Sequence, residues 1–149
     1  MINGEKRTTM EMIAPIGGRP SAYNTGVAAE YFVLSQLYRM GFEAYITFGN
    51  RKSIDIRIIS STGAAATIDV KAVKGFSSVI INNVVPIQNH FIVAVIYNDQ
   101  LANLQTYPET FIIPSQEIES VESRWGTQRR LLKRNLGLFK DAWELLNVV

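Results

Sequence analysis

The segment 91–97 reads FIVAVIY, an almost wholly apolar run of strand-favouring residues. A strand with one wet face alternates apolar and polar residues, whereas a strand buried on both faces is apolar throughout. This segment therefore predicts a central strand whose sheet is covered on both sides. The chain has 149 residues, which is a suitable length for one domain built in this way.

Helical periodicity begins at Asn24, and Asn24 or Thr25 is the candidate N-cap. Gly41 is expected to end the helix as a left-handed cap residue, with Phe42 as its apolar contact. Apolar residues recur between these ends at helical spacing, which predicts that they face the core. They are Val27, Tyr31, Leu34, Leu37 and Tyr38. Residues 1–21 lack periodicity and predict a flexible N-terminal arm.

Three β-type runs follow, at residues 43–48, 53–60 and 64–73. The turn residues Gly49-Asn50 and Ser61-Thr62-Gly63 separate them. Short strands are also predicted at residues 77–81, before an Asn82-Asn83 turn, and at residues 110–113, after a polar loop that spans residues 98–108.

The C-terminal part predicts two helices. The first opens at Pro114-Ser115, with Ser115 as N-cap, and runs to Trp125, where Gly126-Thr127 breaks it. The second covers residues 136–146 and turns four residues inward, namely Leu138, Phe139, Trp143 and Leu146. The order of elements predicts a single α/β domain over residues 22–149, with a mixed sheet of four or five strands flanked by helices.

Several classes of function are excluded by residue content. The chain has no cysteine and one histidine, so neither a thiolate zinc site nor Cys-His catalysis is available. His90 directly precedes the central strand and is interpreted as a strand-end residue rather than a catalytic base. No apolar run reaches 18 residues, so we expect no membrane span. Without a secretion signal or cysteine, a cytoplasmic location is expected.

Basic residues gather in one segment although the net charge is only +2. Between residues 124 and 134 there are five cations and no acids, namely Arg124, Arg129, Arg130, Lys133 and Arg134. One interpretation is a solvated helix face or loop. The other is a phosphate-contacting surface, formed by Arg129, Arg130, Lys133 and Arg134.

Three carboxylates and one lysine carry the candidate chemistry. Glu30 lies in line with the apolar helix stripe, where a carboxylate should be paired, protonated or metal-bound unless it sits at the stripe's edge in water. Asp55 interrupts an isoleucine strand on its less apolar face, which water would also explain. Asp69 and Lys71 lie two apart on the third strand and therefore share a face, a pattern that is common on exposed strands.

Hairpin geometry connects these residues. If the second and third strands form a hairpin centred on Thr62, Asp55 lies opposite Asp69 with Cβ atoms about 5 Å apart. A slip of one residue would put the two on opposite faces. Facing like charges are destabilising unless neutralised, and a divalent cation with a nearby lysine would neutralise them. Oxygen ligands favour Mg²⁺ or Mn²⁺, which polarise phosphates and activate water.

These residues resemble the PD-(D/E)XK, or restriction-endonuclease-like, nuclease superfamily, especially its resolvase-like branch and related bacterial proteins. The resemblance rests on Gly26-x-x-x-Glu30, then Gly41-Phe42, then Asp55, then Ile68-Asp69-Val70-Lys71. It implies that Asp55, Asp69 and the Val70 carbonyl bind metal, that Lys71 is the catalytic lysine and that Glu30 completes or supports the site. Two departures are Ile54 in place of proline and Asp69 in place of the commoner glutamate.

We therefore expect a Mg²⁺- or Mn²⁺-dependent endonuclease that acts on nucleic acid, with DNA as the expected substrate. A homodimer would let two sites cut opposite strands. One alternative is a catalytically silent nuclease-like domain that serves as a DNA-binding or protein-interaction module. Another is a subunit of a larger defence or repair complex that is inactive until a partner supplies recognition.

Overall fold

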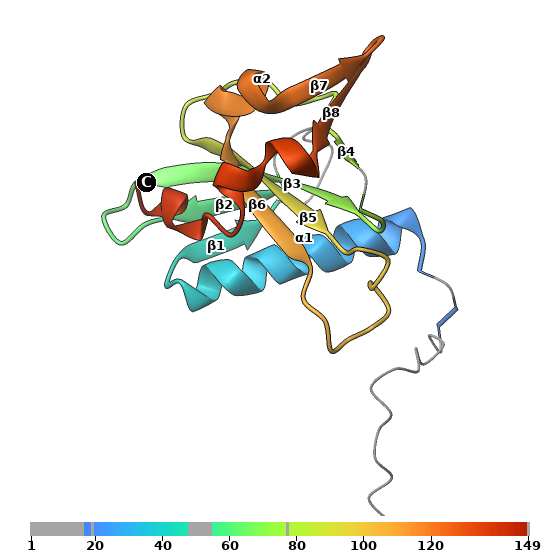
Figure 1. Cartoon of the computed structure of the whole chain (residues 1–149). Helices are drawn as coiled ribbons and strands as arrows, with labels where there is room; N and C mark the ends of the chain where they lie inside the picture. Colours follow the sequence, from blue (N-terminus) through green and yellow to red (C-terminus); the bar gives the residue numbers. More distant parts are fainter. Residues whose placement is uncertain (1–16, 19, 48–54, 77, 149) are drawn as a thin grey trace, which may run out of the picture.

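A computed structural model describes residues 17–18, 20–47, 55–76 and 78–148. The strands of its main sheet are β1 (Glu43–Ile46), β2 (Ile56–Ile59), β3 (Ala65–Val73), β5 (His90–Ile96) and β6 (Glu109–Pro114). Their order is β1-β2-β3-β5-β6, with β3 and β5 parallel and every other neighbouring pair antiparallel (Figure 1). The expected α/β class with a mixed sheet of four or five strands is confirmed. The predicted strand ends at residues 48 and 53–54, and the turn between them, lie outside the described residues.

The predicted first helix is present as α1 (Ala22–Arg39), but its cap is Ser21 rather than Asn24 or Thr25. The Asn24 backbone N–H donates to the Ser21 hydroxyl at 3.2 Å, and the Ser21 N–H donates to the Asn24 side chain at 3.0 Å. This reciprocal capping box begins the helix before its apolar periodicity is visible. The predicted C-terminus is confirmed: Gly41 has φ +87°, and the Phe42 N–H donates to the Leu37 carbonyl at 3.1 Å.

The inward face of α1 differs from the predicted stripe. Thr25, Ala29, Val33 and Leu37 are its buried residues, whereas Tyr31 and Tyr38 are more than half exposed. Leu37 is the one predicted stripe residue that is fully buried. Small side chains at positions 25 and 29 let the helix approach the sheet closely, and close packing favours them over larger apolar groups. Apolarity alone ranks tyrosine and leucine above threonine and alanine, so it selects the wrong neighbouring stripe.

Strand β5 separates two apolar cores. All seven of its residues are buried, which confirms the central strand covered on both faces. Phe91, Val93 and Val95 pack on the side of α1. Ile92, Ala94 and Ile96 pack on the other side, against residues from the C-terminal part of the chain such as Leu131 and Leu136. Figure 1 shows this layered arrangement, with α1 on one side of the main sheet and the segment β7–β8 on the other.

The second layer contains a three-stranded sheet of β4 (Ser78–Ile80), β8 (Gln128–Leu132) and β7 (Glu122–Trp125), in that order. The predicted helix from Ser115 to Trp125 is therefore wrong. Only a 3-10 turn (Ser115–Glu117) and one turn of helix α2 (Ile118–Val121) form before β7 begins. Gly126, with φ +62°, lies in the turn of a β7–β8 hairpin instead of ending a helix. Residues 110–113 form a strand as expected, within β6, and the unexpected strands β7 and β8 follow it.

The Ser115 side chain does not cap a helix. Its hydroxyl donates to the Ile87 carbonyl at 2.8 Å and accepts the Ile87 N–H at 2.9 Å. The side chain thus joins the end of β6 to the loop before β5. Fully buried hydroxyls need such partners, and the partner here is 28 residues away along the chain.

The predicted closing helix at residues 136–146 is also wrong. The structure has short 3-10 turns at Lys133–Asn135, Gly137–Phe139 and Trp143–Val148. Asp141 interrupts them with φ +51°, and its backbone N–H donates to the Thr110 carbonyl on β6 at 2.9 Å. Leu138 is 92% exposed, contrary to its predicted inward position. Phe139 and Leu146 are buried as expected, and Trp143 is partly buried.

The flexible arm predicted at residues 1–21 falls largely outside the described residues, so it stays a prediction. In the part of the chain that the structure describes, no helix is both long and apolar enough to cross a membrane.

Candidate functional site

The hairpin register brings Asp55 beside Asp69. Strand β2 pairs Ile56 with Ile68 and Arg57 with Thr67, and Asp55 directly precedes this paired segment, with its carboxyl group interacting with that of Asp69. The Asp55 backbone N–H donates to the Ile68 carbonyl at 2.9 Å, although Ile68 already pairs with Ile56, so the regular pairing ends there in a bulge. The expected register is confirmed for the four pairs from Ile56–Ile68 to Ile59–Ala65. The turn that sets it is the expected one, with Gly63 at φ +86°.

Asp55 directly precedes β2. Strand β3 is longer and extends past the residue that pairs with the first residue of β2. Oδ2 of Asp55 accepts the Val70 backbone N–H at 2.7 Å, so the side chain takes the place of a strand partner. Burial raises the pKa of Asp55 to about 6, against the lowering effect of the Val70 N–H. The negative charge of Asp69 and a hydrogen bond between the two carboxyl groups also raise this pKa, while Lys71 lowers it. These opposing effects are those expected of two carboxylates that share one site.

Asp69 is almost fully buried, with 1% of its surface exposed. Its Oδ1 lies 3.2 Å from Nζ of Lys71, whose side chain is 22% exposed. Its Oδ2 is buried and has no hydrogen-bond partner among the described residues. An unpartnered buried carboxylate oxygen is costly, and a bound cation would remove that cost. This oxygen is the strongest sign that the site takes a ligand.

Glu30 approaches the pair from α1 and is partly buried. Burial raises its pKa, and the charge of Asp55 raises it further. Glu30 is thus close enough to interact with Asp55, although it lies beside the buried stripe of α1 and not in it as expected. A shallow groove of about 360 Å³ runs between α1 and the end of β1 next to Glu30. Its lining residues are Tyr23, Gly26, Val27, Glu30, Tyr31, Ile46 and Thr47.

The donor set suits a hard cation that keeps several waters. Among the described residues, no three histidine, aspartate or glutamate side chains form a metal-binding group. Two carboxylates and the Val70 carbonyl could still bind one ion, because Mg²⁺ takes few protein ligands and retains water. In an extended strand the N–H and C=O of one residue point to the same side. Since the Val70 N–H points to Asp55, its carbonyl faces that edge of β3.

His90 is closer to the carboxylates than its interpretation as a strand-end residue suggested. It is the first residue of β5, opposite Thr67, and therefore on the face of the sheet that carries Asp69. Its Nδ1 lies 2.7 Å from the Thr67 hydroxyl, and burial lowers its pKa, with smaller effects from Thr67, Asp55 and Lys71. A neutral imidazole here would help to orient the residues that line the site. The signal was the parallel pairing of β3 with β5, which a single sequence does not reveal.

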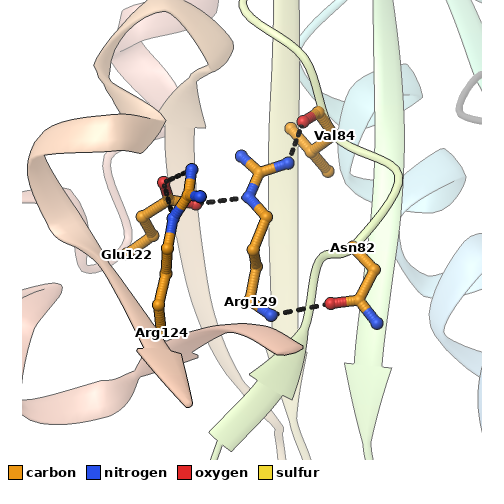
Figure 2. A network of polar contacts seen from close by, with 5 residues as sticks. All are labelled: Asn82, Val84, Glu122, Arg124 and Arg129. Carbon is orange, nitrogen blue, oxygen red and sulfur yellow. Dashed lines mark hydrogen bonds and ion pairs between the residues drawn. The ribbon is translucent and has the colours of Figure 1, made fainter. Parts of the chain in front are cut away.

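The basic segment is divided by the hairpin. Arg129 points inward, where its guanidinium donates to Glu122 and to the Val84 carbonyl, both at 2.6 Å (Figure 2). Arg124 pairs with the same carboxylate at 3.1 Å. Burial alone would raise the pKa of Glu122, but the two guanidinium groups hold it below its usual value. Glu122 lies two residues before the basic segment 124–134. The pairing of β7 with β8 brings its carboxylate next to arginines of that segment.

The other basic residues differ in what surrounds them. Arg130 donates to the Ser78 hydroxyl at 2.6 Å and to the Gln128 side chain at 2.9 Å. Lys133 is ion-paired with Glu109 on β6. Arg134 is exposed on the 3-10 turn after β8. No contact between these residues and the Asp55–Asp69 pair is found in the described part of the chain, so they form a separate region.

Comparison with known proteins identifies the fold. No family model matches the chain, and no curated protein matches it. Among solved structures, the bacterial homing endonuclease I-Ssp6803I superposes with a TM-score of 0.59 at 20% identity, covering 87% of this chain and 94% of that one. Hjc, a Holliday junction resolvase from Archaeoglobus fulgidus, gives 0.55 at 16% identity, covering 82% and 95%.

Both similar structures have the fold that the sequence motifs resemble, which confirms the resemblance at the level of architecture. Identities of 16% and 20% show a shared fold and no more. The chain has the restriction-endonuclease-like fold of PD-(D/E)XK nucleases.

Proposed function

We propose that the protein is a metal-dependent endonuclease that hydrolyses phosphodiester bonds in DNA. The observation that carries the proposal is the buried, unpartnered Oδ2 of Asp69, with the Asp55 carboxyl group close by and the Lys71 ammonium on its other oxygen. Two carboxylates in this arrangement need positive charge nearby, and the Lys71 ammonium balances only part of their negative charge. The similarity of the fold to a homing endonuclease and a Holliday junction resolvase supports a nucleic-acid substrate.

Asp55, Asp69 and the Val70 carbonyl would hold Mg²⁺ or Mn²⁺. Such an ion supplies Lewis-acid polarisation of the phosphate and lowers the pKa of a bound water. The hydrogen bond from the Val70 N–H to Asp55 would keep that carboxylate oriented towards the ion. Orientation by a backbone N–H restricts the side chain without adding a competing positive charge.

Lys71 is the proposed catalytic lysine. Its ammonium lies at the carboxylates and is only 22% exposed, so a phosphate at the site would be within its reach. There the ammonium would donate to a phosphate oxygen or to the attacking water and stabilise negative charge in the transition state. Glu30, whose pKa is raised by burial and by Asp55, would accept a proton or orient water beside the groove.

The nucleic acid would be held by the basic residues Arg129, Arg130, Lys133 and Arg134. Arg130 and Arg134 are the better placed for direct contact, since Arg129 and Lys133 are engaged by Glu122 and Glu109. Phosphate contacts of this kind make binding strongly dependent on salt. We place the protein in the cytoplasm with its substrate, and a homodimer would present two sites to opposite strands.

A catalytically silent binding module is the second candidate. It is favoured by the Lys71–Asp69 ion pair, which partly neutralises the site without any metal. It is also favoured by the lack of a third acidic ligand close to the pair in the described residues. In this alternative the basic residues would still bind nucleic acid.

Calorimetric titration with Mn²⁺ separates the two candidates, followed by a supercoiled-plasmid cleavage assay. The variants are Asp69→Ala, the near-isosteric Asp69→Asn and, as a matched control, Lys74→Ala beside Lys71→Ala. Lys74 is exposed just beyond the end of β3, so its loss should leave cleavage unchanged. We expect Mn²⁺ binding and cleavage in the wild type and loss of both in the Asp69 variants. A wild type that binds no Mn²⁺ would support the silent module.

A further inference from the structure

The three-stranded sheet has two chemically different faces because side chains alternate along its strands. Val79 and Leu131 pair across β4 and β8 and are buried, at 2% and 0% exposure. This inner face packs against the apolar core beneath the sheet. The opposite face, called the outer face here, carries Ser78, Ile80, Ser123, Trp125, Gln128, Arg130 and Leu132. Ser78 and Leu132 are buried, so the open part of this face lies at the other five residues.

The inner face makes the hairpin a rigid support. Arg129 lies on it and joins Glu122 of β7 to the Val84 carbonyl, while its own backbone N–H donates to the Asn82 side chain at 2.7 Å (Figure 2). These bonds tie both strands of the hairpin to the segment that follows β4. The outer face is therefore presented on a fixed backbone and needs little ordering to bind a ligand.

Trp125 is the exposed aromatic residue of the outer face, at the end of the edge strand β7. Its side chain is 57% exposed, and the Arg130 guanidinium lies 5.4 Å from the ring centroid. Arg130 is held in this position by the Ser78 hydroxyl and the Gln128 side chain. The guanidinium lies over the indole ring, and more than half of the Trp125 surface stays open to solvent. A flat, fixed aromatic surface is therefore open to solvent.

The charge of the outer face favours an anionic ligand. None of its residues is acidic, and the one carboxylate of the hairpin, Glu122, is on the inner face with its charge balanced by Arg124 and Arg129. An open aromatic ring backed by a guanidinium is the combination that stacks on nucleobases and contacts the adjoining phosphate.

The outer face belongs to the layer that lies on the catalytic side of the main sheet. Asp69 pairs with Ile92, so both side chains are on one face of the sheet, and Ile92 packs with Val79 and Leu131 of the small sheet. Helix α1 packs on the other side of the main sheet. A nucleic-acid strand bound at Asp69 and Lys71 would therefore lie on the same side of the main sheet as the small sheet.

We propose that the outer face binds an unpaired base of the nucleic-acid substrate, with Trp125 stacking on the base and Arg130 contacting a phosphate next to it. The inference rests on the proposed function only for the identity of the ligand as nucleic acid. It assigns the protein a preference for substrates that contain single-stranded or distorted segments, since a base in regular duplex has no open face to offer.

Fluorescence anisotropy of labelled oligonucleotides tests this, in EDTA so that no cleavage occurs. The ligands are a single strand, the same strand with one abasic position scanned along it, and a duplex. We expect the wild type to bind the intact single strand more tightly than the duplex and the best-placed abasic strand. Stacking on one base corresponds to a change on the order of 5- to 150-fold. Trp125→Ala should remove this difference, and Trp125→Phe should retain most of it.

Leu104→Ala is the control, because Leu104 is 94% exposed in a distant loop and its loss should change nothing. Thermal melting shows whether Trp125→Ala remains folded. Equal affinity for intact and abasic strands in the wild type would overturn the proposal. So would a Trp125→Ala variant that weakens all ligands alike or changes only self-association, which would make the face a contact between copies.

Asp69→Asn distinguishes this proposal from the nuclease proposal. We expect it to keep the preference for the intact single strand while it loses cleavage. If the nuclease proposal fails but the base dependence remains, the outer face stands as a binding site of a silent module.

Discussion

Lys71→Met isolates the electrostatic balance of the candidate site. Methionine keeps most of the length of the lysine stem but removes the ammonium, which lies 3.2 Å from the buried Asp69. Removing one partner of a buried ion pair costs about 3–5 kcal/mol. Because the Lys71 side chain is 22% exposed, we expect a smaller loss of about 2–3 kcal/mol in the free energy of unfolding. For a chain of this size, that lowers Tm by about 5–10 °C in EDTA.

The metal dependence of the variant is the informative part. With no ammonium competing for Asp69, Lys71→Met should bind Mn²⁺ at least as tightly as the wild type. Mn²⁺ at 100 times its Kd would contribute about 2.7 kcal/mol and return Tm close to the wild-type value. Plasmid cleavage should nevertheless be lost, because the proposed catalytic ammonium is gone. Thermal melts with and without Mn²⁺, with Lys74→Met as control, measure each of these effects.

A Lys71→Met variant that melts within about 1 °C of the wild type in EDTA would contradict this prediction, because the Lys71 ammonium would then not stabilise the buried Asp69 carboxylate. The prediction also fails if Mn²⁺ stabilises neither protein. A variant that still cleaves plasmid would remove Lys71 from the chemistry while leaving the metal site intact.

Three other predictions follow from the structure. Burial raises the pKa of Asp55 to about 6, so between about pH 4 and 6 the metal-free folded protein holds a proton that the unfolded chain releases. Stability in EDTA should therefore fall as pH rises from about 4 through 6. Mn²⁺ affinity measured by calorimetry should weaken below about pH 6, and a pH-independent affinity would contradict the assignment. Glu122→Gln leaves the largely buried Arg129 without its carboxylate and should cost about 2–4 kcal/mol in urea unfolding, with Mn²⁺ affinity unchanged. Gly41→Ala places a side chain at φ +87° and should cost about 1–2 kcal/mol in the same assay, and no loss would mean that the helix end rearranges.

The parts of the fold that the sequence predicted are those decided by local chemistry. Gly41 and Phe42 end α1 through backbone bonds within five residues, and the turn at Thr62 and Gly63 sets the β2–β3 register. With that register, Asp55 directly precedes the paired segment and its carboxyl group lies close enough to interact with that of Asp69. The juxtaposition of the two carboxylates was therefore predictable from a segment of fewer than twenty residues.

The parts that could not be predicted depend on distant partners. β8 becomes a strand because it pairs with β4, about fifty residues earlier, and nothing near Arg130 indicates that partner. Asp141 adopts a left-handed conformation held by Thr110 of β6, which prevents the continuous helix expected at residues 136–146. For the same reason, the position of His90 beside Thr67 follows only from the β3–β5 pairing.

The hairpin that carries Asp55 and Asp69 also has a consequence for the kinetics of folding. Its two strands are joined by a short turn, whereas β5, which buries the neighbouring face, must reach β3 across residues 74–89. Contacts between residues close in sequence form early, and distant parallel pairings form late. The two carboxylates therefore meet while water still screens their charges, and they lose that water when β5 docks. The repulsion is concentrated in the docking step, so divalent ions should increase the rate of refolding in addition to stabilising the native state.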